Sequence, residues 1–425
     1  MPEEGPRDSN VDPLARVLRS GPVRGRGTAA KPFASGEHVW LGSRGAAKAC
    51  KEAARQGLGV DASIFSAIRR RRGDLLFDYG ELVALSGDFY GSPEALFDEK
   101  PSPVPWLWEA NDISDLRETF DVELGWIEGA RSGPRPPPYP DNNIRQAWNA
   151  KWYVELALRN VDHFGWHNLV AYCTHHARAL EMAAEAKGEE SERFFEALVH
   201  NAFADHFLTD GFAAGHVRVP RAEILAWANE RGWSDKRAGA LSKLLHDQDG
   251  HIASIHSVTE KRAAKDEGLP VVNARGDEFF ARCDGQLFLG GGHEGGGAVD
   301  LATEAVAASV LELLLAWRKG TMPDGTYAAT VLVPFPAPGS SGLAEKFPGD
   351  LSETRLEALF DSLAWYSGIP WIGPGLERDH VRELFAALPE LMSSFGRSVT
   401  VACAASPTLR TRLPRLYVDA YEKVR

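Results

Sequence analysis

The stretch that decides the fold is SERFFEALVHNAFADHFLT at residues 191–209, which continues directly as DGFAAGH at residues 210–216. Apolar residues in its first part recur at i, i+3, i+4 and i+7, the spacing of one face of an α-helix. Most long periodic segments share this spacing, and few show the alternation of a strand. These segments are 38–56, 75–85, 144–160, 169–186, 191–209, 237–246 and 299–317. The sequence therefore predicts an all-α fold, a multi-helix bundle with long loops.

Outward from this stretch, the chain divides into three expected parts. Residues 1–31, rich in Gly, Pro, Arg and Asp, predict a flexible N-terminal arm, and residues 32–320 predict the main helical domain. Residues 321–425 predict a C-terminal helical subdomain or cap, with amphipathic stretches at 352–366 and 378–395. Between 101 and 142, clustered prolines at 134–140 predict a long surface loop, because proline lacks an amide donor and breaks helices.

Composition and charge exclude several classes of protein. Of the 425 residues, 44% are hydrophobic and 25% charged, which rules out a disordered or collagen-like chain. No apolar run approaches the ~18 residues that a membrane-spanning helix needs. The net charge of −12 repels a phosphate backbone and argues against nucleic acid as a partner. The four cysteines form no CxxC pair, and residues 1–31 lack the apolar stretch of a signal peptide, so we expect a cytoplasmic protein with reduced thiols.

Histidine is strongly concentrated in one part of the chain. Ten of the thirteen histidines fall between His163 and His256. Within this window, His206 and Asp210 are four residues apart, so both side chains project from the same face of a helix about 6 Å apart. Gly211 and Gly215 then allow the chain to curl and bring His216 back to the same cavity. Histidine and carboxylate ligands in this pattern predict a metal site.

Several separate segments resemble the zinc-dependent phospholipase C and S1/P1 nuclease superfamily, whose members are all-helical enzymes with three zinc ions. His38-Val-Trp-Leu resembles the family's early His-x-Trp helix, and Asp162-His163-Phe164 resembles its His-Phe segment. HxxxDxxxxxH at 206–216 matches the central motif, and His-Asp-Gln-Asp-Gly at 246–250 follows in the expected order. The resemblance covers roughly residues 36–318 and implies a bundle of the same type.

The resemblance implies a role for each of these side chains. His163 and His206 would bind the first zinc ion, and His38 the third, with Asp210 bridging the first and third ions. His216 would bind the second ion. The second ion's other histidine would be His246.

The family also uses carboxylates that this chain matches less directly. An aspartate ahead of the His-Phe segment is a metal ligand and base in the family; we choose Asp88 for both roles, with Asp78 as the alternative. The family's glutamate four residues after the last histidine corresponds to Gly250, so we expect Asp249, or else Asp247, to replace it.

A further departure concerns the third zinc site. Extracellular members bind this ion through the amino group of a processed N-terminal tryptophan. Here a long arm precedes His38, and the chain has no tryptophan before Trp40. Unless the arm is cleaved, the third site lacks two donor atoms, so we expect two or three zinc ions.

Together these features predict a zinc-dependent, phospholipase C-like hydrolase of phosphoesters. Paired metals lower the pKa of a bound water, and the resulting hydroxide attacks phosphorus while Asp88 acts as base. Trp106, Trp108, Trp126 and Trp148 could stack bases in a single-strand nuclease, but their segment is poor in Lys and Arg. A phospholipase would need an apolar rim around its site, which Trp365, Trp371 and Phe395 could form. The acidic charge favours a phospholipid or a small phosphoester as substrate.

Two alternatives from other classes remain open. The same set of ligands could serve non-hydrolytic or biosynthetic chemistry, or a closed zinc site could staple a helical bundle. The histidines outside the predicted ligand set receive plainer interpretations. We expect His175 and Asn168 to orient ligands, and His200, His251 and His256 to lie at the surface or beside ligands. The sequence does not determine the oligomeric state.

Overall fold

A computed structural model describes residues 35–69, 76–98, 111–132, 160–188, 191–250, 269–282, 287–288, 297–337, 356 and 375–423. The expected N-terminal arm lies outside these residues. So do the prolines at 134–140, His251, His256 and all but the last residue of the helix expected at 144–160.

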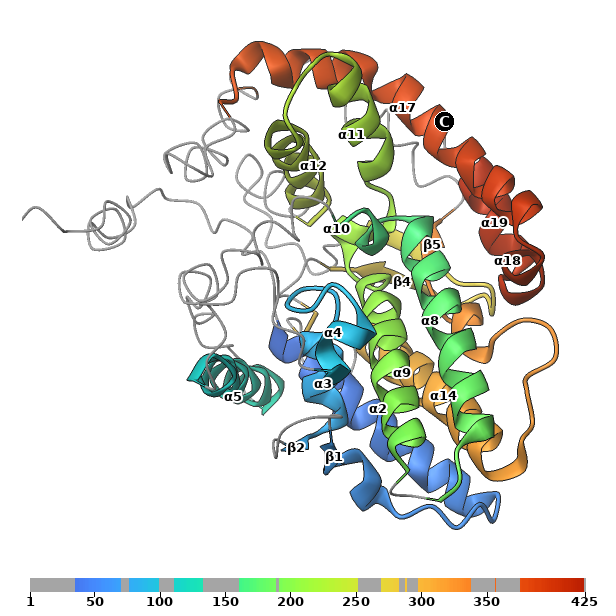
Figure 1. Ribbon diagram of the computed structural model, residues 1–425. Coiled ribbons are helices and arrows are strands. Elements are labelled where there is room, and N and C mark those ends of the chain that lie inside the picture. The colour runs from blue at the N-terminus through green and yellow to red at the C-terminus, as the bar shows by residue number, and fades with distance from the viewer. Residues whose placement is uncertain are drawn as a thin grey trace, which may run out of the picture.

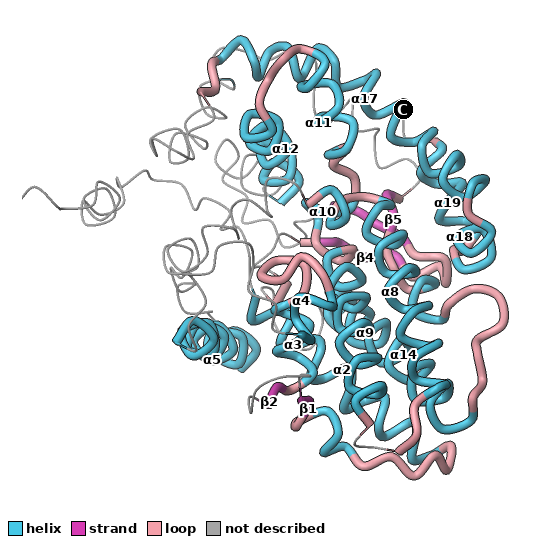
Figure 2. The backbone as a smooth tube through the Cα atoms, in the orientation of Figure 1, coloured by secondary structure: helices cyan, strands magenta, loops and turns pink. Residues whose placement is uncertain are grey.

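The described part of the chain is mostly helical, as Figures 1 and 2 show. The helices are α2 (Ser35–Arg55), α3 (Tyr79–Leu85), α4 (Pro93–Asp98), α5 (Asn111–Ser132), α8 (Trp166–Glu185), α9 (Glu192–Asp210), α10 (Ala214–Val217), α11 (Arg221–Glu230), α12 (Asp235–Gly250), α14 (Gly297–Lys319), α17 (Arg378–Ala405), α18 (Pro407–Arg412) and α19 (Arg415–Glu422). Single 3₁₀ turns are η1 (Ala62–Phe65), η2 (Val161–His163) and η3 (Ala328–Val331). The predicted helical class is confirmed.

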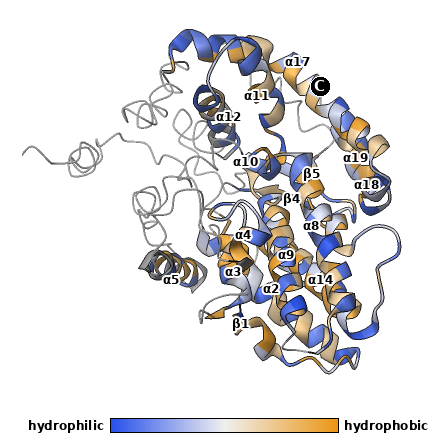
Figure 3. Ribbon diagram, in the orientation of Figure 1, coloured by the Kyte–Doolittle hydropathy of each residue, from blue (hydrophilic) through white to orange (hydrophobic). Residues whose placement is uncertain are grey.

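The centre of the bundle is made by α2, α8, α9 and α14, which lie side by side in Figure 1. The helix α9 begins where the Ser191 hydroxyl accepts a hydrogen bond from the Phe194 amide at 3.1 Å, which satisfies one of the free amides of the first turn. Figure 3 shows hydrophobic residues gathered on α2, α3, α9 and α14, where these helices meet. Burial of these faces holds the histidine-bearing end of α9 in a rigid frame.

Strands are few and short in the described part of the chain. Strands β1 (Ile68–Arg69) and β2 (Leu76–Phe77) form an antiparallel pair, with Ile68 opposite Phe77. Strand β3 (Leu269–Val272) pairs antiparallel with both β4 (Glu278–Ala281) and β5 (Phe335–Pro336). Each has too few residues for the sequence to show an alternating pattern.

The helix α5 corrects one prediction, because it lies within the surface loop expected at 101–142. Its buried residues Leu116, Phe120, Glu123 and Ile127 follow the spacing of a helical face. The prolines that suggested a loop begin at 134, after α5 has ended. The segment of α5 itself contains no proline, and its hydrophobic spacing determines its structure.

The C-terminal helices α17, α18 and α19 pack against the main helical part. One hydrophobic cluster contains buried residues from α2 through to α19. The Tyr421 hydroxyl donates a hydrogen bond to the Val217 carbonyl in α10, and the Trp166 indole donates to the Phe395 carbonyl at 3.2 Å. These helices thus support the segments that carry the candidate site. Among the described residues, no helix has the length and apolar character needed to cross a membrane.

Candidate metal centre

The end of α9 supplies the first two side chains of the site. His206 and Asp210 lie on the same face of this helix, and Nε2 of His206 is 3.7 Å from Oδ2 of Asp210. Both side chains are buried. The spacing in sequence therefore places them as expected, one turn apart and directed into the same space.

His38 reaches the same carboxylate from the first turn of α2. Its Nε2 lies 3.5 Å from Oδ1 of Asp210, and its ring stacks on that of His206 at a centroid distance of 4.5 Å. His38, His206 and Asp210 each offer a ligand atom, and these atoms all lie within 4.8 Å of one another. This group can hold a metal ion.

A second group, formed by Asp88, His163 and His206, meets the same criterion. Asp88 follows α3 in a turn at Gly87, whose φ of +72° disfavours other residues. A Cβ atom at Gly87 would lie only 2.5 Å from Cδ2 of His206, so the chain passes directly against the ligand rings. Asp78, the alternative to Asp88, instead caps α3 by accepting a hydrogen bond from the Glu81 amide at 2.8 Å.

Hydrogen bonds outside the site orient two of the rings. Nδ1 of His206 lies 3.0 Å from the Val83 carbonyl, which can only accept a hydrogen bond. Nδ1 of His216 lies 2.7 Å from the His163 carbonyl in the same way. Both rings must therefore carry their proton on Nδ1, so Nε2 is the unprotonated nitrogen, the form that binds a metal.

The Thr209 hydroxyl likewise determines which nitrogen of His38 carries the proton. Its hydroxyl donates toward the main-chain carbonyls of Asp205 and His206 at 2.9 and 2.8 Å, so its oxygen is left to accept from Nδ1 of His38 at 2.8 Å. Nε2 of His38, the nitrogen that faces Asp210, is then the unprotonated one. This role of Thr209 could not be predicted from the sequence, because it depends on which turn of α9 meets α2.

Asp210 provides the test of whether a metal fits this site. Ring nitrogens of His163 and His206 approach its Oδ2 at 2.7 and 3.7 Å, and Nδ1 of His216, which donates to the His163 carbonyl, lies 3.9 Å away. Even so, this buried oxygen receives no hydrogen bond of normal geometry from the described residues. Convergence without hydrogen bonding is the arrangement of ligands around a common ion, so the donor set fits a metal.

The electrostatics of the site keep its groups in their metal-binding forms. Burial alone raises the pKa of Asp210, but the attraction of the surrounding histidines, His216 first, outweighs burial and holds that pKa well below its usual range. Burial is also the main cause that lowers the pKa of His206 well below its usual value. At neutral pH the carboxylate is ionised and the imidazole neutral, as metal ligands must be.

His216 and His246 form a further pair beside this centre. Their rings lie 5.0 Å apart, and the His216 ring stacks on Phe164 with centroids 4.6 Å apart. A Cβ atom at Gly215 would lie 2.2 Å from Cδ2 of His246, so only glycine allows this approach. The structure therefore brings together seven of the eight predicted ligands: His38, Asp88, His163, His206, Asp210, His216 and His246.

The eighth, Asp249, has another partner. Arg218 donates two hydrogen bonds to its carboxylate, from Nε at 2.7 Å and from Nη2 at 2.5 Å. The two side chains are only 2% and 0% exposed. Asp249 is thus held by a cation from α10, and its role as metal ligand remains a prediction. The side chain of Asp247 lies outside the described residues.

Other expectations for histidines need correction. His176, not its neighbour, points into the bundle, where its nitrogens contact Asn201 at 2.7 Å and Glu312 at 2.9 Å. His175 stacks on Phe207 instead of orienting a ligand. His200 is buried, which excludes the surface position, one of the two expected for it.

A buried polar network that the sequence did not predict involves Asp205, one residue before His206. Asn201 and the Tyr79 hydroxyl both donate hydrogen bonds to Oδ2 of Asp205, at 3.2 and 2.7 Å. Burial raises the pKa of Asp205 to about 7. The signal for this network would have been polar residues on the inner face of a helix, which became visible only after the helices were packed.

Two aromatic side chains considered as binding surfaces lie in the interior. Trp126 and Phe395 are 5% and 0% exposed, so they pack the core instead of stacking bases or forming an apolar rim. The remaining tryptophans named for those roles, Trp106, Trp108, Trp148, Trp365 and Trp371, lie outside the described residues.

The fold and the site define a mostly helical protein with a candidate metal centre of histidine and aspartate ligands. Comparisons of this chain with protein-family models, with curated proteins and with solved structures each found no match. What the protein does is therefore argued from its own side chains.

Proposed function

We propose that this protein is a metal-dependent hydrolase of phosphoesters. The observation that carries the proposal is the pair of ligand groups that share His206, one with His38 and Asp210 and the other with Asp88 and His163. One imidazole nitrogen binds one ion, but Asp210 faces His38 with Oδ1 and His163 with Oδ2, so its carboxylate can bridge two ions and keep them close together, as in enzymes that clamp a phosphate between paired metals. Nitrogen and oxygen donors without thiolate suit zinc.

The chemistry divides between the bound ions and the chain. Paired ions, when bound, polarise the phosphoester and lower the pKa of a bound water to about 7. The carboxylate of Asp88 would accept a proton from the attacking water and orient the oxygen of that water toward phosphorus. The carbonyls of Val83 and His163 hold the rings of His206 and His216 by accepting their Nδ1 protons.

The acidic chain favours a small substrate or a lipid headgroup over a nucleic acid. The net charge is −12, and long-range repulsion reduces the association rate of a polyanion more than that of a single diester. The substrate class that follows is a phosphodiester of low charge.

The test joins metal content with hydrolysis of bis(p-nitrophenyl) phosphate. We expect at least two zinc ions per chain in the wild type and the loss of one or more in His206→Ala and Asp210→Ala, with hydrolysis falling by about 10²–10⁴-fold. His380→Ala is the matched control, since that histidine caps α17 away from the site. Full metal content and full activity in both site variants would overturn the proposal. So would a single closed zinc site.

A further inference from the structure

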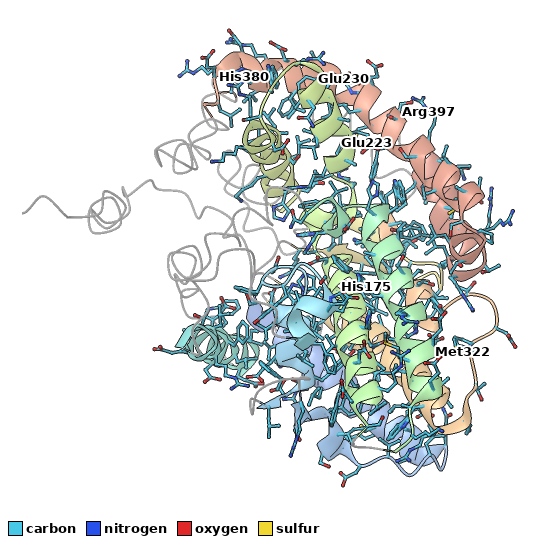
Figure 4. All side chains as sticks on the ribbon, in the orientation of Figure 1. His175, Glu223, Glu230, Met322, His380 and Arg397 are labelled. Carbon is cyan, nitrogen blue, oxygen red and sulfur yellow. The ribbon has the colours of Figure 1, made fainter. Side chains whose placement is uncertain are left out.

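A second group of histidines lies on the other side of Phe207 from the candidate metal centre. The Phe207 ring is 5.0 Å from the ring of His163 and stacks at 5.8 Å on the ring of His175. His175 is therefore separated from the centre by an aromatic ring. Figure 4 labels it on the face where α8 and α9 lie side by side.

Three helices contribute to this group. His175 comes from α8, His200 from α9 and Glu94 from the first turn of α4. The two imidazole rings are 6.1 Å apart between centroids, and Nε2 of His200 is 3.9 Å from Oε1 of Glu94. Residues far apart in the sequence thus present two nitrogen donors and one carboxylate to the same space.

The side chain of His200 is buried without the bonds that burial normally requires. It is 8% exposed, its Nδ1 has no hydrogen-bond partner, and its Nε2 is too far from Glu94 for a hydrogen bond. A buried polar group left without a partner destabilises the folded protein. An ion beside Glu94 would be bound by Nε2, the nitrogen of His200 that faces this carboxylate, while the ring proton stays on Nδ1.

Both imidazoles have their lone pairs available at neutral pH. Burial is the main cause that lowers the pKa of His175 to about 4, and that of His200 likewise to about 4. Neutral histidine is the form that binds metals. Two histidines with one glutamate are also the protein ligands of known mononuclear zinc sites that keep an open position.

We propose that His175, His200 and Glu94 form a separate binding site for one divalent transition metal ion, with zinc as the best match. Zinc–nitrogen bonds of about 2.0–2.1 Å place two tetrahedrally bound imidazoles with centroids roughly 5 Å apart, slightly closer than here. In the candidate metal centre, the ligand atoms of each group all lie within 4.8 Å of one another. The ligand atoms of His175, His200 and Glu94 do not meet this limit. The Glu94 side chain is 58% exposed, and its carboxylate, which now has hydrogen bonds to Ser92 and to its own amide, would have to turn toward the rings.

Bound metal would join α4 to α8 and α9. An ion that binds only the folded protein raises its stability according to its concentration and affinity. The site is therefore expected to raise the melting temperature of the protein in zinc, independently of the candidate metal centre.

The experiment uses the full chain with the centre disabled. His206→Ala protein, stripped by a chelator, is titrated with zinc against a chromophoric competitor, alone and combined with His175→Phe, His200→Phe or Glu94→Gln. Phenylalanine preserves the aromatic packing, and Glu94→Gln changes a mostly exposed side chain, so these variants are expected to fold. His380→Ala in the same background is the control.

We expect each phenylalanine variant to lose one equivalent of zinc and Glu94→Gln to weaken binding at that site by at least about tenfold. The control keeps the full amount. Equal zinc binding in all of the variants would overturn the proposal, as would a loss of zinc in His380→Ala as large as in His200→Phe. The background already lacks His206, so neither result depends on the hydrolase proposal.

Discussion

Breaking the ion pair between Arg218 and Asp249 tests how the second pair of histidines is held. Arg218 follows His216 by two residues, and Asp249 follows His246 by three. The two hydrogen bonds between them, at 2.7 and 2.5 Å, connect α10 to α12 in an environment from which water is excluded. The pair therefore fixes the distance between the elements that carry these two histidines.

The magnitude follows from the burial of both charges. Removing Arg218 leaves the buried Asp249 carboxylate without its cation, and removing Asp249 takes from Arg218 two hydrogen bonds to a carboxylate; breaking a buried pair in this way costs about 3–5 kcal/mol. We expect Arg218→Met and Asp249→Asn each to lower the free energy of unfolding by this amount. The double variant Arg218→Met/Asp249→Leu should lose clearly less than the sum, because neither charge is then left alone.

Urea unfolding of metal-free protein, repeated with zinc, separates the two roles of Asp249. If Asp249 acts through Arg218, both single variants are destabilised without metal, and both weaken zinc binding to a similar extent. If Asp249 is a ligand, Asp249→Asn loses zinc while Arg218→Met retains it. A cost below about 1 kcal/mol for Arg218→Met in metal-free protein would refute the reasoning from burial.

Two further predictions concern a glycine and a buried histidine. Gly87→Ala should reduce metal content, because the new Cβ atom would displace the His206 ring. Gly57→Ala is the control: Gly57 has a similar φ of +70° and open space around it, so this variant should keep the metal although it bears the same backbone strain. A Gly87→Ala protein with full metal content would contradict this. Burial lowers the pKa of His167 from 6.5 to about 4. As the pH falls, the unfolded chain therefore takes up a proton at this histidine before the folded chain does. The free energy of unfolding should fall by on the order of 3 kcal/mol between pH 6.5 and about 4. Unfolding measured across this range should show a smaller decrease for His167→Phe, and an identical pH profile would exclude the effect.

Part of the fold and of the site could be predicted from the sequence, because local spacing determines them. Apolar periodicity located α2, α8, α9 and α14 to within a few residues, since a helix must bury one face. The four-residue separation of His206 and Asp210 placed both on that helix's inner face. The choice of Asp88 over Asp78 also agrees with the geometry, because Asp78 is used as a cap.

Other features depended on contacts between distant residues, which local spacing does not contain. Asp249 was expected to bind metal, but only the packing of α12 against α10 places Arg218 on its carboxylate. The segment of α5 was predicted to be a loop because of the prolines that follow it, although its own hydrophobic spacing is that of a helix. The sequence by itself determined which residue types could bind a metal and which helices carry them. Tertiary structure alone decided which histidine nitrogens carry the proton and which charges already have partners, because both depend on hydrogen bonds between segments that meet only in the folded chain.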